Sequence, residues 1–311
     1  YRIARSFEIK SHRLCRIGAY SLHHGLLYLG IEESRMKAHD QDICQSCGQR
    51  SPQWTAAFPE VGIRRCAHCG SLTFFPHSAL DLGSLYSPEY FQGGEYSDYQ
   101  GHRRAHEDCF RRKWKLIQSL LPGEIRVFEM GCAYGFFVNY ARTHGAKEAF
   151  GVDVSPEIIA KAQQSFGPHY GVVPAVPPFK YNCLVAWDVW EHLEQPLTTM
   201  GEKIAQLEPG GLFAFTTVDS SSFVARTRGS RWRQIHPPTH MHYPTYHALE
   251  MGMKHLGLEV VHHSHFAQSR ALEMYLDAVG MGRWFPKIEW LRKLPVPLNL
   301  FDIQLIIARK K

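Results

Sequence analysis

From residue 124 onward, short apolar runs alternate with amphipathic stretches, and this alternation restricts the possible fold more than any other feature. Runs typical of strands lie at about 125–130, 149–153, 183–187, 212–217, 258–263 and 303–308. Helical patterns lie at about 105–120, 135–144, 155–165, 196–207 and 244–255. Strands that alternate with helices form a doubly wound α/β sheet, which binds ligands at the carboxyl ends of its strands. We therefore expect an α/β fold with a ligand site at those ends.

The first strand leads into FEMGCAYGFF (128–137), which reads as a strand, a glycine turn and the start of a helix. A dinucleotide site needs G-x-G-x-x-G, because the second glycine lets the backbone approach a pyrophosphate. Counted from Gly131, the third position is Ala133 and the sixth is Phe136, so the glycines for that role are absent. Asp153 ends the next strand, where an acid can bind both ribose hydroxyls. These features predict a nucleoside ligand without phosphate. S-adenosylmethionine fits, since its positive charges suit the nearby carboxylates.

Four of the eight cysteines fall in two pairs, Cys44-x-x-Cys47 and Cys66-x-x-Cys69, and a glycine follows each pair. Such turns can aim two thiolates at one point, and two of them complete a tetrahedral zinc site. Four protein ligands leave no open position, so we expect a structural zinc ion in a zinc-ribbon module at 36–75. Two disulfides or four buried thiols are the alternatives. A two-residue gap poorly suits a disulfide, and nothing convincing indicates export.

The segments on either side of this module are less regular. Residues 1–35 show no clean periodicity, and Met36 follows Glu32-Glu33, whose codons can form a ribosome-binding sequence. We interpret 1–35 as a translated leader outside the fold. Residues 76–105 are rich in aromatic residues, Gly, Pro and Ser, and we expect an irregular bridge whose rings pack against the next domain.

Charge and hydropathy exclude some classes of protein. The net charge is +6, but half of it comes from residues 1–35, so the rest of the chain is close to neutral and has no strong nucleic-acid signature. No apolar run approaches the length needed to cross a bilayer. We expect a cytoplasmic protein without a membrane span.

Five motifs in order give the domain at 106–311 a resemblance to the class I S-adenosylmethionine-dependent methyltransferases, in their small-molecule branch. They are EMGCAYG at 129–135, Asp153, WDVWEHL at 187–193, Pro209-Gly210-Gly211 and HMHYP at 240–244. The resemblance implies a Rossmann-like, seven-stranded sheet. The cysteine module ahead of it resembles a subgroup often associated with sugar, surface-polysaccharide or natural-product pathways. The implied cofactor-binding residues are Glu129, Gly131, Cys132, Gly135, Asp153, Val154 and Trp187.

Methyl transfer to a hydroxyl or an acidic carbon needs a base, and histidine titrates near neutral pH. The resemblance places His192 beside the methyl group, and His240 and His242 in a loop that covers the acceptor. These three are the candidate catalytic residues, with hydrogen-bonded structural histidines as the alternative reading. Glu191 and these histidines could also bind a metal, although their spacing does not specify one. Residues 266–300 form an insertion that could shape the acceptor pocket or a dimer contact.

The expected function is methyl transfer to a small molecule, such as a sugar, a polysaccharide precursor or a natural-product intermediate. One alternative is an RNA methyltransferase that holds RNA with its zinc ribbon, and a clustered Arg/Lys face would support it. The near-neutral body and the absence of an Asn-Pro-Pro-Tyr-type motif count against it. The other alternative is a non-catalytic binding protein on the same fold. Neither the acceptor atom nor the oligomeric state follows from the sequence.

Overall fold

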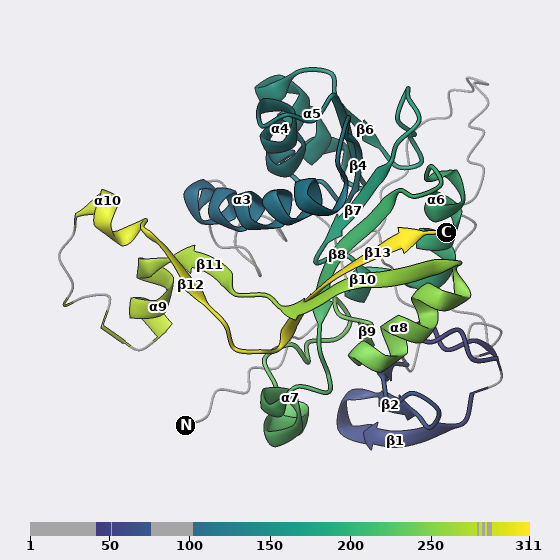
Figure 1. Ribbon diagram of the computed structural model, residues 1–311. Coiled ribbons are helices and arrows are strands. Elements are labelled where there is room, and N and C mark those ends of the chain that lie inside the picture. The colour runs from purple at the N-terminus through teal and green to yellow at the C-terminus, as the bar shows by residue number, and fades with distance from the viewer. Residues whose placement is uncertain (1–41, 51, 76–101, 279, 282–283, 285–287) are drawn as a thin grey trace, which may run out of the picture. The chain divides into compact units, whose positions relative to one another are not determined.

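The computed structural model describes residues 42–50, 52–75, 102–278, 280–281, 284 and 288–311 (Figure 1). The leader predicted at 1–35 and nearly all of the aromatic bridge lie outside these residues, so both stay predictions. Within the described part of the chain, no helix is both long and apolar enough to cross a membrane.

A seven-stranded sheet forms the centre of the α/β domain and confirms the predicted fold class. Its order is β10-β13-β8-β7-β4-β5-β6. The strands are β4 (Arg126–Met130), β5 (Glu148–Asp153), β6 (Tyr170–Val172), β7 (Cys183–Trp187), β8 (Leu212–Val218), β10 (Leu258–His265) and β13 (Ile303–Lys310). β13 runs antiparallel to both of its neighbours, and the pairs from β8 through β6 are all parallel.

Helices cover both faces of this sheet (Figure 1). On one face lie α3 (Arg103–Leu120), α4 (Phe136–Thr143) and α5 (Pro156–Phe166), and on the other lie α6 (Pro196–Gln206) and α8 (Tyr246–His255). Successive side chains of a strand point to opposite faces of the sheet, so each strand contacts both helix layers. Val127 of β4 packs with the first set of helices, and its neighbour Phe128 packs with the second. Ser155 caps α5 as expected, with its Oγ accepting from the Ile158 amide at 3.4 Å.

The cysteine pairs lie on a second, antiparallel sheet of order β1-β2-β3-β9. Three strands come from the cysteine-bearing segment: β1 (Trp54–Phe58), β2 (Ile63–Cys66) and β3 (Leu72–Phe74). The fourth, β9 (His242–Tyr243), comes from the loop before α8 and pairs with β3. The cysteine module and the α/β domain therefore share one sheet.

Shorter elements complete the described chain. They are the 3-10 turns at Pro59–Val61, Trp190–His192 and Gly229–Arg231, the helices α7 (Phe223–Arg228), α9 (Leu272–Ala278) and α10 (Glu289–Arg292), and the strands β11 (Gln268–Ala271) and β12 (Pro295–Leu298). β11 and β12 pair as an antiparallel ribbon within the 266–300 insertion. This ribbon lies beside α3, which brings the insertion to the edge of the candidate site.

Candidate functional site

The turn between β4 and α4 contains two positions where the backbone conformation and the close packing require glycine. Gly131 and Gly135 both have positive φ angles, of 70° and 76°. A Cβ at Gly131 would lie 2.5 Å from a Val189 methyl group, and one at Gly135 would collide with the ring of Tyr170. Both glycines are therefore required by the local packing as well as by their φ angles.

Asp153 fixes the middle of this turn. Its Oδ2 accepts from the Ala133 amide at 2.9 Å, and its Oδ1 accepts from the Ser155 amide at 3.1 Å. Ala133, which replaces the usual middle glycine, has a positive φ of 45°. Burial raises the pKa of Asp153, and the amide bonds act in the opposite direction. Each carboxylate oxygen has two lone pairs, so Asp153 can still accept from ribose hydroxyls.

Glu129 offers a buried carboxylate that a cation would stabilise. Its side chain is 3% exposed, and its Oε2 has no hydrogen-bond partner among the described residues. Burial raises the pKa of Glu129 well above its ordinary value, and the nearby Lys113 opposes this shift. A buried carboxylate oxygen without a hydrogen-bond partner is costly. The ammonium group of S-adenosylmethionine has the charge and the hydrogen-bond donors to satisfy it.

The other predicted cofactor residues differ in their surroundings. The Cys132 side chain is buried against β5, at Gly151. Val154 follows Asp153 and is 56% exposed, which suits an apolar contact with a ligand. Trp187 ends β7 and lines a pocket at the carboxyl end of that strand.

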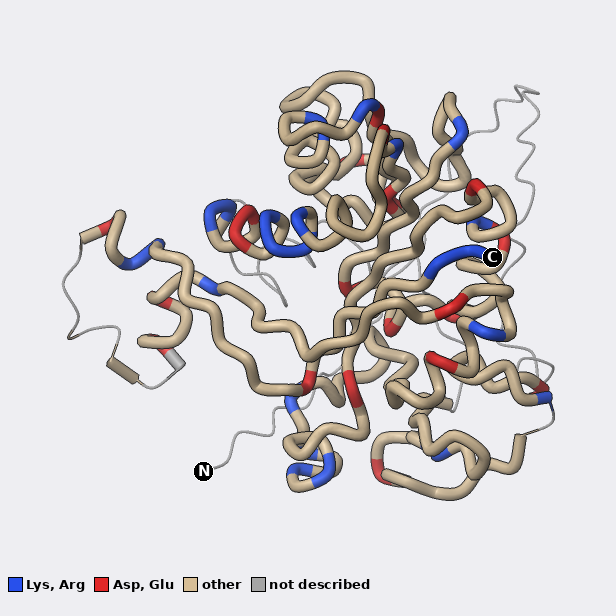
Figure 2. The backbone as a smooth tube through the Cα atoms, in the orientation of Figure 1, with Lys and Arg blue, Asp and Glu red and all other residues tan. Residues whose placement is uncertain are grey.

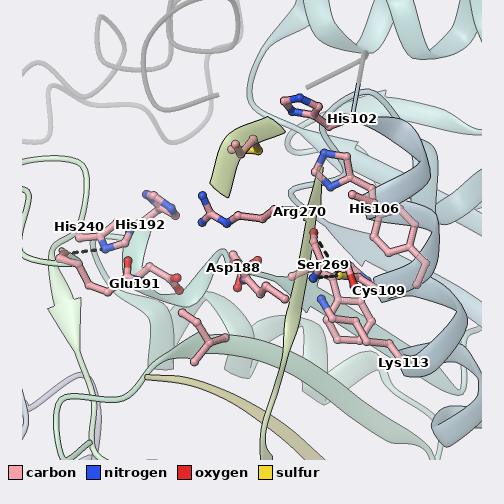
Figure 3. Close-up of a pocket in the computed structure, with 17 residues that line it drawn as sticks. His102, His106, Cys109, Lys113, Asp188, Glu191, His192, His240, Ser269 and Arg270 are labelled. Carbon is pink, nitrogen blue, oxygen red and sulfur yellow. Dashed lines mark hydrogen bonds between the residues drawn. The ribbon is translucent and has the colours of Figure 1, made fainter. Parts of the chain in front are cut away.

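This pocket, of about 190 Å³, lies at the end of β7, and Val189, which follows the lining residue Asp188, packs against Gly131 of the glycine turn. Its lining residues are His102, Ala105, His106, Cys109, Phe110, Lys113, Trp187, Asp188, Glu191, His192, Gln234, His240, Gln268, Ser269, Arg270, Met274 and Ile303. Figure 3 shows α3 forming one wall and the Glu191 segment forming the facing wall, with Arg270 reaching in between. Four residues of the 266–300 insertion, Gln268, Ser269, Arg270 and Met274, line this pocket. The insertion therefore shapes the pocket, which is one of the two roles that the sequence suggested for it.

Three charged lining residues were not predicted from the sequence. Lys113 is 4% exposed and lies over the Trp187 ring, with its Nζ 4.2 Å from the ring centroid. Its position three residues after Phe110, on the apolar face of the helix, is a signal that could have identified it. Asp188 accepts from Gln268 Nε2 at 3.3 Å. The Arg270 side chain forms no hydrogen bond or ion pair with another described residue, and no sequence pattern marks it.

Two of the three candidate catalytic histidines meet in the pocket. His192 and His240 lie with their ring centroids 4.6 Å apart, and Glu191 is beside them. The ligand atoms of these three residues all lie within 4.8 Å of one another. Burial lowers the pKa of His240 well below its ordinary value, so its ring is neutral at pH 7.

The structure places His242 elsewhere. It lies in β9, opposite Thr73 of β3, and does not line the pocket. Its Nε2 is 3.0 Å from the Glu194 carbonyl oxygen, and its Nδ1 is 3.5 Å from Thr73 Oγ1. Burial lowers the pKa of His242 to about 4. These contacts are those of a neutral, hydrogen-bonded histidine between two segments of the fold.

The four predicted zinc ligands come together on the other sheet. Cys44, Cys47, Cys66 and Cys69 are all buried, and their sulfur atoms lie within 4.8 Å of one another. All four are free thiols in the structure, and among the described residues no cysteine forms a disulfide. A tetrahedral arrangement of four thiolates is the usual zinc donor set.

Comparison with known proteins assigns the chain to a protein family. A family described as a methyltransferase domain matches residues 99–263. The ribosomal protein L11 methyltransferase of Burkholderia ambifaria is 31% identical over 109 residues, which are 33% of this chain. The chain spans only 35% of the length of that relative. An S-adenosylmethionine-dependent methyltransferase from Mesorhizobium loti is similar in structure, with a TM-score of 0.44 at 18% identity over 64% of this chain and 97% of that one. The magnesium protoporphyrin IX methyltransferase of Synechocystis, with S-adenosylhomocysteine bound, has a TM-score of 0.47 at 14% identity over 72% and 97%.

Proposed function

This chain belongs to the methyltransferase-domain family, and from that premise we propose that it transfers a methyl group from S-adenosylmethionine to a small polar acceptor. The observation that carries the proposal is the adjacency of two features. The buried Glu129 carboxylate, whose Oε2 has no partner among the described residues, lies near the end of β4, and a pocket with a polar lining lies at the end of the neighbouring β7.

The cofactor side of the site consists of the glycine turn and the strand ends around it. We assign the ammonium group to Glu129 and the ribose hydroxyls to Asp153, whose oxygens already face the turn. Gly131 and Gly135 keep the turn close to the ligand, Cys132 packs behind it, and Val154 and Trp187 supply apolar contacts.

On the acceptor side, the pocket has a polar lining that suits a hydroxylated metabolite. Its volume is about 190 Å³, and most of its lining side chains can form hydrogen bonds. Hydroxyl groups suit the histidine, glutamine and aspartate side chains, and an anionic group suits Arg270. This combination favours a sugar or a related hydroxylated metabolite that carries a carboxylate or a phosphate.

S-adenosylmethionine supplies a methyl group that its sulfonium has already activated. The residues of the pocket must therefore align the acceptor and exclude water. The acceptor atom must also lose its proton as its new bond to carbon forms, while the electron pair of the broken bond remains on sulfur. His192 and His240 lie where this activation is needed, and His242 is not part of the set.

RNA as the acceptor has less support. The arginines that would support it are spread over different elements: Arg64 and Arg65 on β2, Arg103 on α3, Arg226 and Arg228 on α7, and Arg231 and Arg233 at and just after the 3-10 turn Gly229–Arg231. Figure 2 shows the basic residues of α3 interspersed with acidic ones and far from those of α7. Arg233 lies near the pocket residue Arg270, but it pairs with Asp302.

A screen with radiolabelled S-adenosylmethionine tests the proposal. The acceptors are nucleotide sugars, acidic saccharides and bulk RNA, with Glu129→Gln as the comparison variant. We expect label on at least one small acceptor and a strong loss of transfer in the variant. Label on RNA alone would favour the alternative enzyme, and no binding of S-adenosylmethionine in calorimetry would favour a non-catalytic protein.

The cysteine cluster serves a different purpose. We assign a structural zinc ion to Cys44, Cys47, Cys66 and Cys69, because four sulfur donors leave no position open for a substrate. The cluster lies on the second sheet, and none of its members lines the pocket. Zinc content measured on the purified protein should fall by one ion per chain in a Cys66→Ser variant.

A further inference from the structure

We propose that Glu191, His192 and His240 bind a divalent transition-metal ion on the wall of the pocket. Their donor atoms lie within 4.8 Å of one another, and two of the three residues are buried. Ligand distances of about 2.1 Å need donors roughly 3–4 Å apart, a closure of at most about 2 Å that side-chain rotation can supply. Two imidazole nitrogens and one carboxylate oxygen form a donor set that favours zinc, iron, cobalt or manganese.

The hydrogen bonds of both histidines prepare them as ligands. His192 Nδ1 lies 2.8 Å from the Thr239 carbonyl oxygen, and His240 Nδ1 lies 3.1 Å from the Gln234 carbonyl oxygen. A carbonyl only accepts, so each Nδ1 carries the proton and each Nε2 carries the lone pair. Metal-binding histidines have this second hydrogen bond in almost all known sites, because it fixes the tautomer and the orientation of the ring.

Glu191 is oriented in a similar way. Thr217 Oγ1 donates to Glu191 Oε2 at 2.7 Å, and both residues are buried. The Met241 amide donates to the Glu191 carbonyl oxygen at 2.8 Å, which ties the His240 segment to the Glu191 segment. The three donors therefore lie on two segments that are joined through the backbone, so a metal ion would find the site nearly formed.

The position of the cluster indicates what the ion would do. All three residues line the pocket, so an ion held by three protein ligands keeps positions open toward the acceptor. This part of the inference rests on the proposed methyl transfer: an acceptor hydroxyl bound to the ion loses its proton to water more readily, and the resulting oxyanion attacks the methyl carbon. The cysteine cluster, with four protein ligands, has no such open position.

The test is a titration of the full chain, already loaded with zinc at the cysteine site, with Co²⁺. Isothermal titration calorimetry counts the ions, and visible absorption reports whether the donors are nitrogen and oxygen or sulfur. We expect one Co²⁺ per chain without loss of zinc. Glu191→Gln and His240→Gln should each weaken binding at least about tenfold. His102→Gln is the matched control, since His102 lines the same pocket outside the cluster, and its affinity for Co²⁺ should equal that of the wild type.

Glutamine can still accept from Thr217, so Glu191→Gln should remain folded, and circular dichroism and retained zinc verify this for each variant. Failure of the wild type to bind Co²⁺, or equal binding by the folded Glu191→Gln and His240→Gln variants, would overturn the metal site. Binding of S-adenosylmethionine to the same protein is measured separately. A protein that binds S-adenosylmethionine but no Co²⁺ leaves the proposed function intact and removes only the metal.

Discussion

Thr73 of the cysteine-bearing sheet pairs with His242, which lies two residues after the pocket residue His240. The Phe74 amide also donates to the Met241 carbonyl oxygen at 2.8 Å, and Thr245 Oγ1 donates to the Cys69 carbonyl oxygen at 3.2 Å. These bonds join the cysteine module to the segment that forms one wall of the pocket. Loss of order in the module must therefore disturb that wall.

Removal of zinc should reduce both stability and methyl transfer. Structural zinc contributes about 10–16 kcal/mol to the folding of small zinc-binding peptides, so we expect the chelated protein to lose several kcal/mol of unfolding free energy. Thermal melting, methyl transfer and zinc content are measured before and after chelation. Reloading with zinc, as the control, should restore all three. A chelated protein with an unchanged melting temperature and full activity would show that the cluster does not depend on a metal.

Glu129→Gln should change ligand affinity and protein stability in opposite directions. The substitution removes a buried carboxylate whose Oε2 has no described partner, so the ligand-free protein should be as stable as the wild type or more so. It also removes an ionic partner of the cofactor ammonium, which costs about 1.5–3 kcal/mol of binding, or roughly 10- to 100-fold in affinity. Calorimetry with S-adenosylmethionine and urea unfolding measure the two effects. Unchanged affinity would show that Glu129 does not contact the cofactor.

The fold could be predicted because most of its strands and helices are marked by patterns in short, continuous stretches of the sequence. The apolar runs mark six of the seven strands, and the acids at strand ends mark the cofactor side. β6 was not located, because it is three residues long and is followed by a proline-rich stretch. So short a strand is stabilised by its pairing with β5 and has no periodicity of its own.

The pocket could be predicted only in part because its residues meet through long-range contacts. The sequence treats His240 and His242 alike, since both lie in one histidine-rich loop. They differ because β9 pairs with β3, about 170 positions earlier in the chain, and this pairing takes His242 out of the pocket. Arg270 reaches the pocket because the insertion folds back beside α3, which no local pattern indicates.

The two roles assigned to the histidines can be separated by substitution. His192→Gln should lower kcat by about 100-fold or more, because it removes a group that activates the acceptor. His242→Gln should lower the unfolding free energy by about 1–3 kcal/mol, because it disturbs buried hydrogen bonds to Glu194 and Thr73. Once folded, this variant should keep the kcat of the wild type. Steady-state kinetics and urea unfolding measure both. A folded but inactive His242→Gln protein would return His242 to the catalytic set.

Acidification should destabilise the protein partly through His106. Burial lowers the pKa of His106 to about 4, assisted by the charges of His102, Lys113 and Arg270 and opposed by Asp188. The folded state therefore keeps His106 neutral, and the unfolded chain binds a proton below about pH 6.5. Stability is lost as the pH falls from about 6.5 toward 4, by up to about 1.4 kcal/mol per pH unit from this residue. Urea unfolding at pH 6.5 and 5 should show a loss larger by up to about 2 kcal/mol in the wild type than in His106→Gln. Parallel pH dependence in the two proteins would mean that His106 is protonated in the folded state.

Arg270→Gln should raise the KM for the acceptor much more than it lowers kcat. Arg270 points into the pocket toward the Glu191 wall and forms no ion pair with another described residue, so its charge is available to an anionic group of the acceptor (Figure 3). The loss of a charged hydrogen bond costs about 1.5–3 kcal/mol, which corresponds to a rise in KM of roughly 10- to 100-fold. The matched control is Arg292→Gln, on the same insertion, where Arg292 pairs with Glu273 and does not line the pocket. The KM for S-adenosylmethionine should stay constant in both variants. An equal KM for the acceptor in Arg270→Gln and Arg292→Gln would mean that the acceptor carries no anionic group at this position.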